Sequence, residues 1–123
     1  MEKRDGLAKH QVVSFSHAFD GIAYNIKTQI HFRIHLVAAV LVVVLGTFYK
    51  IAPFEWIILV ILITSVMAVE AMNTAIEETC NMMHPESHPH ARMAKHCAAA
   101  SVLILSIGAA VVGFIIFVPK IFG

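Results

Sequence analysis

Four polar side chains recur at helical spacing at the end of a long apolar segment. They are Glu70, Asn73 or its neighbour Thr74, Glu77 and Asn81, each three or four residues after the one before. Residues at this spacing stack on one face of an α-helix. A carboxylate at membrane depth costs ~2.5 kcal/mol or more near a helix centre, so it tends to face a protein interior or a wet cavity. The stripe is therefore a candidate functional site.

The two carboxylates of this stripe, Glu70 and Glu77, differ in their expected depth in the membrane and therefore in their access to water. Glu70 precedes Glu77 by seven residues and so lies ~10 Å deeper along the helix. A poorly solvated carboxylate takes up a proton more readily, which suits a general base. A carboxylate nearer water suits a hard cation such as Mg²⁺. Together they predict a site where a lipid hydroxyl meets a magnesium nucleotide. The alternative, a solvated helix end, fits Glu78, which lies off the stripe.

The groups that could hold a nucleotide do not form a glycine-rich loop. Neither GxxxxGK[ST] nor GxGxxG occurs, and the six glycines are scattered. Lys and Arg can pair with phosphates instead, although the same residues also mark a cytoplasmic loop. The candidates are His10 and His17 near the N-terminus, and Glu86, His88, Arg92, Lys95 and His96 in the segment HPESHPHARMAKH.

The histidines and two cysteines also raise the possibility of a zinc site. Cys80 and His84 are four residues apart, and further histidines follow. Zinc uses both residue types. Their spacing matches no paired knuckle, however, and Cys97 begins an apolar segment where thiols usually serve packing. Structural cysteines are therefore favoured over a zinc site.

The composition predicts a membrane protein. The 123 residues suffice for one domain, and 59% of them are hydrophobic while only 14% are charged. The mean hydropathy is +0.78. A formal net charge of +1 argues against a nucleic-acid partner, which requires a clustered basic face.

The apolar pattern predicts an all-α fold with three transmembrane helices, over about 32–51, 54–80 and 97–118. An amphipathic surface helix is expected before them, over about 7–30, because apolar residues recur there every three or four positions. A helix docked on protein would show the same periodicity. The apolar residues of that face are Val12, Phe15, Phe19, Ile22, Ile26 and Ile30.

Basic residues predict the orientation in the membrane. Seven Lys and Arg lie before the first span or between the second and third, against Lys50 and Lys120 on the other side. Cytoplasmic loops carry the excess of basic residues, so the N-terminus and the loop over 80–96 are expected in the cytoplasm. No apolar run begins in the first thirty residues, so no cleavable signal peptide is expected.

The stripe resembles the signature of the bacterial diacylglycerol kinase and undecaprenol kinase family of small membrane lipid kinases. The matching residues are Glu70, Ala71, Asn73, Thr74, Ala75, Ile76 and Glu77, followed by Pro85-Glu86, His88-Pro89 and Ala94-Lys95. The segments SFSHAFDGI and FRIHLVAA are also similar, and IIFVPKI resembles the chain end of Gram-positive members. The resemblance implies a homotrimer in the bacterial inner membrane that phosphorylates a lipid alcohol from magnesium ATP.

The resemblance also implies residue roles. Glu70 would take the proton from the lipid hydroxyl, Asn73 would orient the site, and Glu77 would bind Mg²⁺ together with position 29. The implied nucleotide contacts are His10, His17, Gln29, Glu77, Glu86, Ser87, His88, Lys95 and His96. The implied lipid contacts are Ser14, Phe15, Phe19, Arg33, Glu70 and Ala99.

Three positions depart from the family pattern. Gln29 replaces a metal-binding glutamate, and Asn81 and His96 each replace an aspartate. A neutral amide should weaken Mg²⁺ binding.

A working kinase for undecaprenol or diacylglycerol remains the favoured interpretation, with undecaprenol preferred because of the flanking segments. The alternatives are a weakened relative that binds lipid or nucleotide without efficient turnover, and a proton-coupled transporter built on Glu70.

Overall fold

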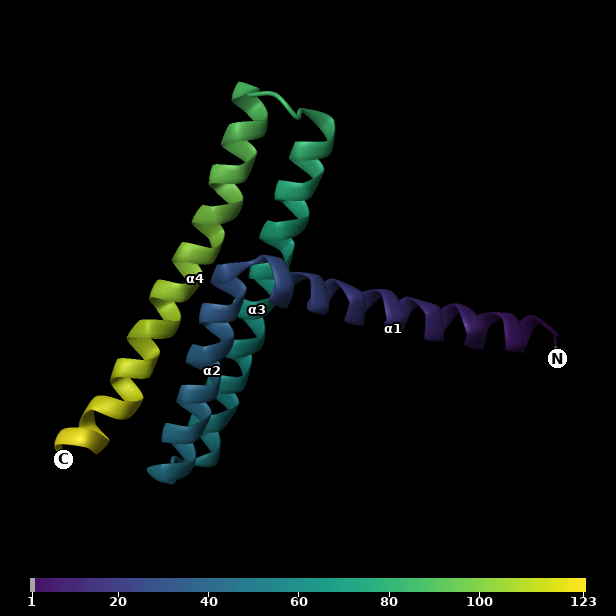
Figure 1. Cartoon of the computed structure of the whole chain (residues 1–123). Helices are drawn as coiled ribbons and strands as arrows, with labels where there is room; N and C mark the ends of the chain where they lie inside the picture. Colours follow the sequence, from purple (N-terminus) through teal and green to yellow (C-terminus); the bar gives the residue numbers. More distant parts are fainter. Residues whose placement is uncertain (1) are drawn as a thin grey trace.

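The computed structural model describes residues 2–123, with side chains from Lys3 onward. This part of the chain is all-helical: α1 (Glu2–Thr28), α2 (Ile30–Phe48), α3 (Pro53–Met83) and α4 (Pro89–Phe122). Helices α2, α3 and α4 are long and apolar enough to cross a membrane. They lie side by side as a bundle, and α1 extends sideways from it (Figure 1).

The three apolar helices differ in length, and the difference creates a projecting hairpin. Helix α2 has 19 residues, whereas α3 has 31 and α4 has 34. At the helical rise, α2 spans about 28 Å and matches a ~30 Å hydrocarbon core, while α3 and α4 exceed it. Figure 1 shows α3 and α4 continuing past the level at which α1 joins α2. Glu70 still lies level with the first turns of α2, where it contacts His35, and the stripe continues from there toward the projecting hairpin.

The bend between α1 and α2 occurs at one residue. Gln29 has extended backbone angles, φ −107° and ψ 108°, between two helical segments. Its N–H still donates to the carbonyl of Asn25 at 2.9 Å, and its carbonyl accepts from the N–H of Arg33 at 3.3 Å. The chain therefore changes direction at Gln29 while its backbone stays hydrogen-bonded on both sides.

The bundle is closed at the end opposite the hairpin. A core of Ile51, Leu59, Ile116 and Phe117 joins the α2–α3 turn to the C-terminal part of α4. Gly46 permits this close packing, because a Cβ there would lie 2.8 Å from the Trp56 ring. The turn itself uses a positive φ of 50° at Lys50, which ends α2 at Phe48 rather than near residue 51.

Polar contacts fix the same end. Pro53 occupies the first turn of α3, where its missing N–H costs no hydrogen bond. Glu55 accepts from the N–H of Ala52 at 3.2 Å, and it pairs with Lys120 at 3.2 Å. At the other end of the bundle, Pro89 begins α4 after His88, so this helix starts eight residues before the expected span.

Most apolar side chains of the single chain are exposed. Within the most apolar stretch of each membrane helix, between 11% and 17% of residues are buried. On α1, every described side chain from Lys3 to Ile22 is exposed, including Phe15 and Phe19. The single chain covers little of its apolar surface, and the expectation that α1 lies in the membrane interface stays a prediction.

Candidate functional site

The deepest polar group of the stripe is Glu70, and it is almost fully buried. It keeps 4% of its exposure because it points from α3 toward α2. There His35 Nε2 lies 3.3 Å from Glu70 Oε1. A buried carboxylate is tolerated when a partner offsets its lost hydration. The His35 imidazole supplies that partner, so Glu70 is held in place and remains within an apolar setting.

One turn further along α3, Asn73 and Glu77 form a second pair. The Asn73 side-chain nitrogen donates to Glu77 Oε1 at 3.3 Å. The side-chain oxygen Oδ1 of Asn73 is buried and accepts no hydrogen bond from the described residues. Buried acceptors normally have a partner, so this oxygen is an exception within the described part of the chain. Asn73 and Glu77 thus present oxygen atoms on the same face as Glu70.

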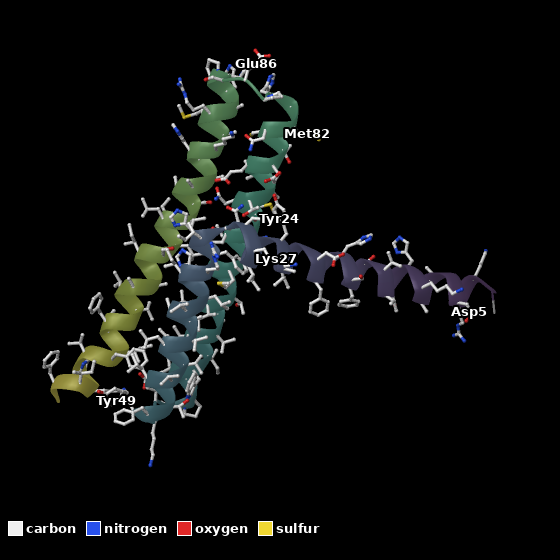
Figure 2. The ribbon with its side chains drawn as sticks, viewed as in Figure 1. Asp5, Tyr24, Lys27, Tyr49, Met82 and Glu86 are labelled. Atoms are coloured by element: carbon white, nitrogen blue, oxygen red, sulfur yellow. The ribbon has the colours of Figure 1, made fainter. Side chains whose placement is uncertain are left out.

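The neighbouring face of α3 binds α1 instead. Thr74 is buried, and its hydroxyl donates to Asn25 Oδ1 at 2.7 Å. One turn on, the Tyr24 hydroxyl donates to Glu78 Oε1 at 2.8 Å; Figure 2 shows Tyr24 where α1 meets α3. This hydrogen bond is the main reason that the pKa of Tyr24 is raised above its ordinary value of 10.0, with burial and the nearby carboxylate adding to it.

Gln29 lies at the bend that these contacts position. It is half-buried, and its side-chain nitrogen donates to Thr28 Oγ1 at 3.1 Å. No hydrogen bond joins Gln29 to Glu77 in the described part of the chain. Asn25 lies four positions before Gln29, and it contacts α3 directly through Thr74. The expected metal pair of Gln29 and Glu77 therefore stays a prediction.

The loop residues gather at the tip of the α3–α4 hairpin. A hollow of about 260 Å³ is lined there by Asn81, His84, Pro85, Glu86, Ser87, His88, Ala91, Arg92 and Lys95. Lys95 donates to the side-chain oxygen of Asn81 and so links the two helices. His88 precedes α4 and accepts from the N–H of His90 at 3.2 Å, while its ring stacks on His84. His96 is exposed and does not line this hollow.

The single chain separates the predicted nucleotide contacts. Asn81 follows Glu70 by eleven residues along α3, about 16 Å at the helical rise. Figure 2 shows Glu86 at the far tip of the hairpin. His10 and His17 are exposed on α1, which leads away from the bundle. Their roles stay predictions.

The zinc alternative gains no support from the described residues. No group of three or more His, Cys, Asp and Glu side chains is placed to hold a metal ion among them. Cys80 is half-buried and Cys97 is exposed, and both thiols are free. A cation at the stripe would therefore need ligands beyond these side chains, such as the phosphates of a nucleotide.

Sequence reasoning missed three residues of this region: Tyr24, Asn25 and His35. Asn25 lies three residues after Ile22 on the apolar side of α1, where a polar residue requires a partner. His35 is an ionisable residue inside an apolar span, which is a signal for function or pairing. The sequence could have flagged both residues, but it could not have identified Thr74 and Glu70 as their partners.

Comparisons with known proteins place this chain among lipid kinases of prokaryotes. A family model described as prokaryotic diacylglycerol kinase matches residues 16–117. The undecaprenol kinase of Bacillus subtilis is 35% identical over 108 residues, covering 88% of each chain. The diacylglycerol kinase of Synechocystis is 33% identical over 116 residues, covering 94% of this chain and 66% of that protein. The matched range includes the whole stripe and the loop.

Proposed function

This chain belongs to the prokaryotic diacylglycerol kinase family, and on that premise we propose that it transfers the γ-phosphoryl group of ATP to the hydroxyl of a membrane lipid. The proposed location is the cytoplasmic face of the bacterial inner membrane. One observation carries the proposal: Glu70 is a buried carboxylate where the apolar part of α3 ends, and it is in contact with an imidazole. A carboxylate in this position is suited to accept the proton of a lipid hydroxyl.

The proposed reaction is a direct transfer. Glu70 takes the proton of the lipid hydroxyl as the hydroxyl oxygen forms a bond to the γ-phosphorus. The bond from that phosphorus to the oxygen bridging to the β-phosphate breaks, and ADP leaves. Asn73 holds Glu77 through its amide nitrogen, which fixes the second carboxylate relative to the first. The helix thereby positions both acidic groups about two turns apart.

The oxygen atoms of the stripe fit a divalent cation, for which we propose Mg²⁺. Glu77 offers a carboxylate, and the unpartnered Oδ1 of Asn73 lies on the same helix face. Gln29 would add an amide oxygen. Mg²⁺ favours oxygen ligands and commonly binds one or two carboxylates plus substrate phosphates. When bound, it would neutralise charge on the transferring phosphoryl group.

The nucleotide is proposed to bind near the hairpin. Arg92 and Lys95 line its hollow together with Glu86, Ser87 and His88, so two cations are available to phosphates. His96 follows on α4, and His10 and His17 are proposed as further contacts from α1. In the single chain these groups are distributed over separate regions, which supports the proposal that copies assemble, as a homotrimer, to bring them together.

The lipid is proposed to be undecaprenol. This choice is supported by the Bacillus subtilis relative, whose name is undecaprenol kinase and which aligns over 88% of both chains. Diacylglycerol is the competing acceptor. The proposed lipid contacts are all exposed in the single chain, apart from Glu70 itself, and so are accessible to a lipid: Ser14, Phe15, Phe19, Arg33 and Ala99.

A kinase assay in proteoliposomes tests the proposal. The purified chain is supplied with labelled ATP, Mg²⁺ and either undecaprenol or diacylglycerol, and phosphorylated lipid is measured. Wild-type protein should phosphorylate one of the two. Glu70→Gln should lose ~100-fold or more of the rate, because a neutral amide of similar shape cannot accept the proton. Asp20→Asn, on an exposed carboxylate of α1, is the matched control and should stay active.

Two outcomes would contradict the proposal in different ways. If wild-type protein phosphorylates neither lipid while it binds both ATP and lipid, the chain is the weakened relative that Gln29, Asn81 and His96 suggest. If Glu70→Gln keeps most of the wild-type rate, the base lies elsewhere. Circular dichroism and the elution volume in detergent establish that the variant is folded.

A further inference from the structure

His35 is an ionisable side chain inside the first membrane helix. It lies one turn after the buried Phe32, on the side of α2 that faces α3. Its side chain keeps 23% exposure, against 5% for its partner Glu70. Ionisable groups in apolar helices are costly and usually have a partner or a function. The contact with Glu70 therefore requires an explanation beyond packing.

We propose that His35 is the positioning residue of the catalytic carboxylate. Its Nε2 lies 3.3 Å from Glu70 Oε1, and this contact leaves the second carboxylate oxygen for the hydroxyl of the lipid. This inference rests on the proposed function, in which Glu70 is the base. It adds a group on a different helix that fixes the orientation of that base before substrate arrives.

The contacts of the Glu70 carboxylate support the assignment. Among the described residues, His35 is the group that contacts the Glu70 carboxylate within hydrogen-bond or ion-pair distance. A glutamate has three rotatable bonds, so a carboxylate without that contact would sample several orientations. Bases in active sites are generally oriented by a third group. Here the orienting group is on α2 and the base is on α3, so the α2–α3 packing sets the geometry.

A histidine suits this role better than a lysine or arginine. A neutral imidazole donates from one nitrogen and adds no net charge. A permanent cation at the same distance would stabilise the ionised carboxylate strongly and reduce its tendency to take up a proton. His35 therefore holds Glu70 and still leaves it able to act as a base.

The surroundings strengthen the contact between His35 and Glu70. His35 is one of the residues that line an apolar hollow of about 260 Å³ between α2, α3 and α4. Its other walls are almost entirely aliphatic, among them Ala39, Leu59 and Ala110. An electrostatic contact next to such a low-dielectric space is stronger than one in water. The pair should persist in the membrane.

Two substitutions separate positioning from packing. His35→Leu keeps a comparable volume but removes the donor, whereas His35→Gln keeps a side-chain N–H at similar reach. We expect His35→Leu to lower kcat by about 10- to 100-fold, the scale of one charge-assisted hydrogen bond. KM for ATP and lipid should stay within about twofold. His35→Gln should recover most of kcat. His31→Leu, at an exposed histidine one turn earlier on α2, is the control.

A double variant tests whether His35 acts through Glu70. If it does, His35→Leu combined with Glu70→Gln should be no slower than Glu70→Gln alone, because the base that His35 orients is already absent. Additive losses would overturn the proposal, as would a His35→Gln variant as slow as His35→Leu. A loss expressed only in KM would show that His35 contacts substrate instead.

Infrared spectroscopy tests the pair without any enzyme activity. The difference between wild type and Glu70→Gln isolates the carboxylate band of Glu70, and the same difference on the His35→Leu background should shift it. His35→Gln should restore the band. A shifted band in a protein that phosphorylates no lipid would leave the contact standing while the proposed function fails. An unshifted band in an active kinase would overturn the inference alone.

Discussion

Gln29 is one of the three residues that depart from the pattern implied by the resemblance. The resemblance implies a carboxylate there, and this chain supplies a neutral amide at the bend between α1 and α2. Affinity for hard cations depends strongly on the number of charged ligands. If Gln29 and Glu77 both bind the cation, this chain should bind Mg²⁺ more weakly than a protein with two carboxylates.

Restoring the charge tests this role. Gln29→Glu should lower the Mg²⁺ concentration for half-maximal kinase rate by several-fold, with the largest gain at limiting metal. At saturating metal the gain should shrink if position 29 only binds the cation. Gln11→Glu, at an exposed glutamine far along α1, adds the same charge away from the site. Superimposable Mg²⁺ curves for wild type and Gln29→Glu would remove position 29 from the metal site.

Tyr24 allows a prediction about pH. Its pKa is raised above 10.0, chiefly because its hydroxyl donates to Glu78. A group with a raised pKa in the folded state contributes stability that is fully present below its ordinary value and is lost as pH rises through the raised value. The α1–α3 contact should therefore be intact at neutral pH and weaken above pH 10, when the phenolate faces a carboxylate.

An absorbance titration measures the shift. Tyr49→Phe leaves Tyr24 as the one tyrosine, and its midpoint of ionisation should lie above 10.0. Adding Glu78→Gln should bring the midpoint back toward that value, because the charged acceptor is gone. Equal midpoints in the two proteins would mean that the hydrogen bond to Glu78 does not form in the membrane.

At the scale of elements, the attachment of α1 to α3 depends on a buried side-chain hydrogen bond. Thr74 donates to Asn25, and both are about 95% buried or more. Leaving a buried polar group unpartnered costs ~1–3 kcal/mol. Thr74→Val removes the donor at nearly constant shape, so it should loosen α1 and lower the thermal unfolding temperature in detergent.

A matched variant on the same helix controls for the loss of a hydroxyl. Thr64 is exposed and donates only to carbonyls of its own helix, Val60 and Ile61, so Thr64→Val should have little effect. Protease cleavage within α1 should accelerate in Thr74→Val and remain at the wild-type rate in Thr64→Val. Equal cleavage rates in all three proteins would show that α1 is held by other contacts.

The helices themselves could be predicted from the sequence, because apolar length and turn residues act locally. Residues such as Pro53 and Pro89 begin helices by rules that need no tertiary information. The pair of His35 and Glu70 could not be predicted. It joins residues 35 positions apart, and its formation depends on the rotation of α2 against α3. Periodicity selects a face of one helix but not the residue opposite it.

At the scale of the whole molecule, the side of the membrane that Lys and Arg predict to be cytoplasmic must be the side on which the candidate site lies. Glu70 contacts the first part of α2 through His35, and Glu86 lies beyond it at the tip of the α3–α4 hairpin (Figure 2). The α2–α3 turn, which follows Tyr49, lies at the opposite end of the bundle (Figure 2), and there Lys120 pairs with Glu55. ATP is cytoplasmic, so the proposed kinase works only if the hairpin end faces the cytoplasm.

Labelling from outside the cell tests this orientation. Three spans would place the termini on opposite sides, and the seven to two distribution of Lys and Arg predicts that the N-terminal side lies in the cytoplasm. A tag after Gly123 should react with an impermeant reagent in intact spheroplasts, and a tag before the first helix should react only after permeabilisation. A cysteine introduced at exposed Glu86, in a background without Cys80 and Cys97, should behave like the N-terminal tag. The reverse pattern would place the hairpin outside, where ATP is absent, and a kinase acting at this site would then be untenable.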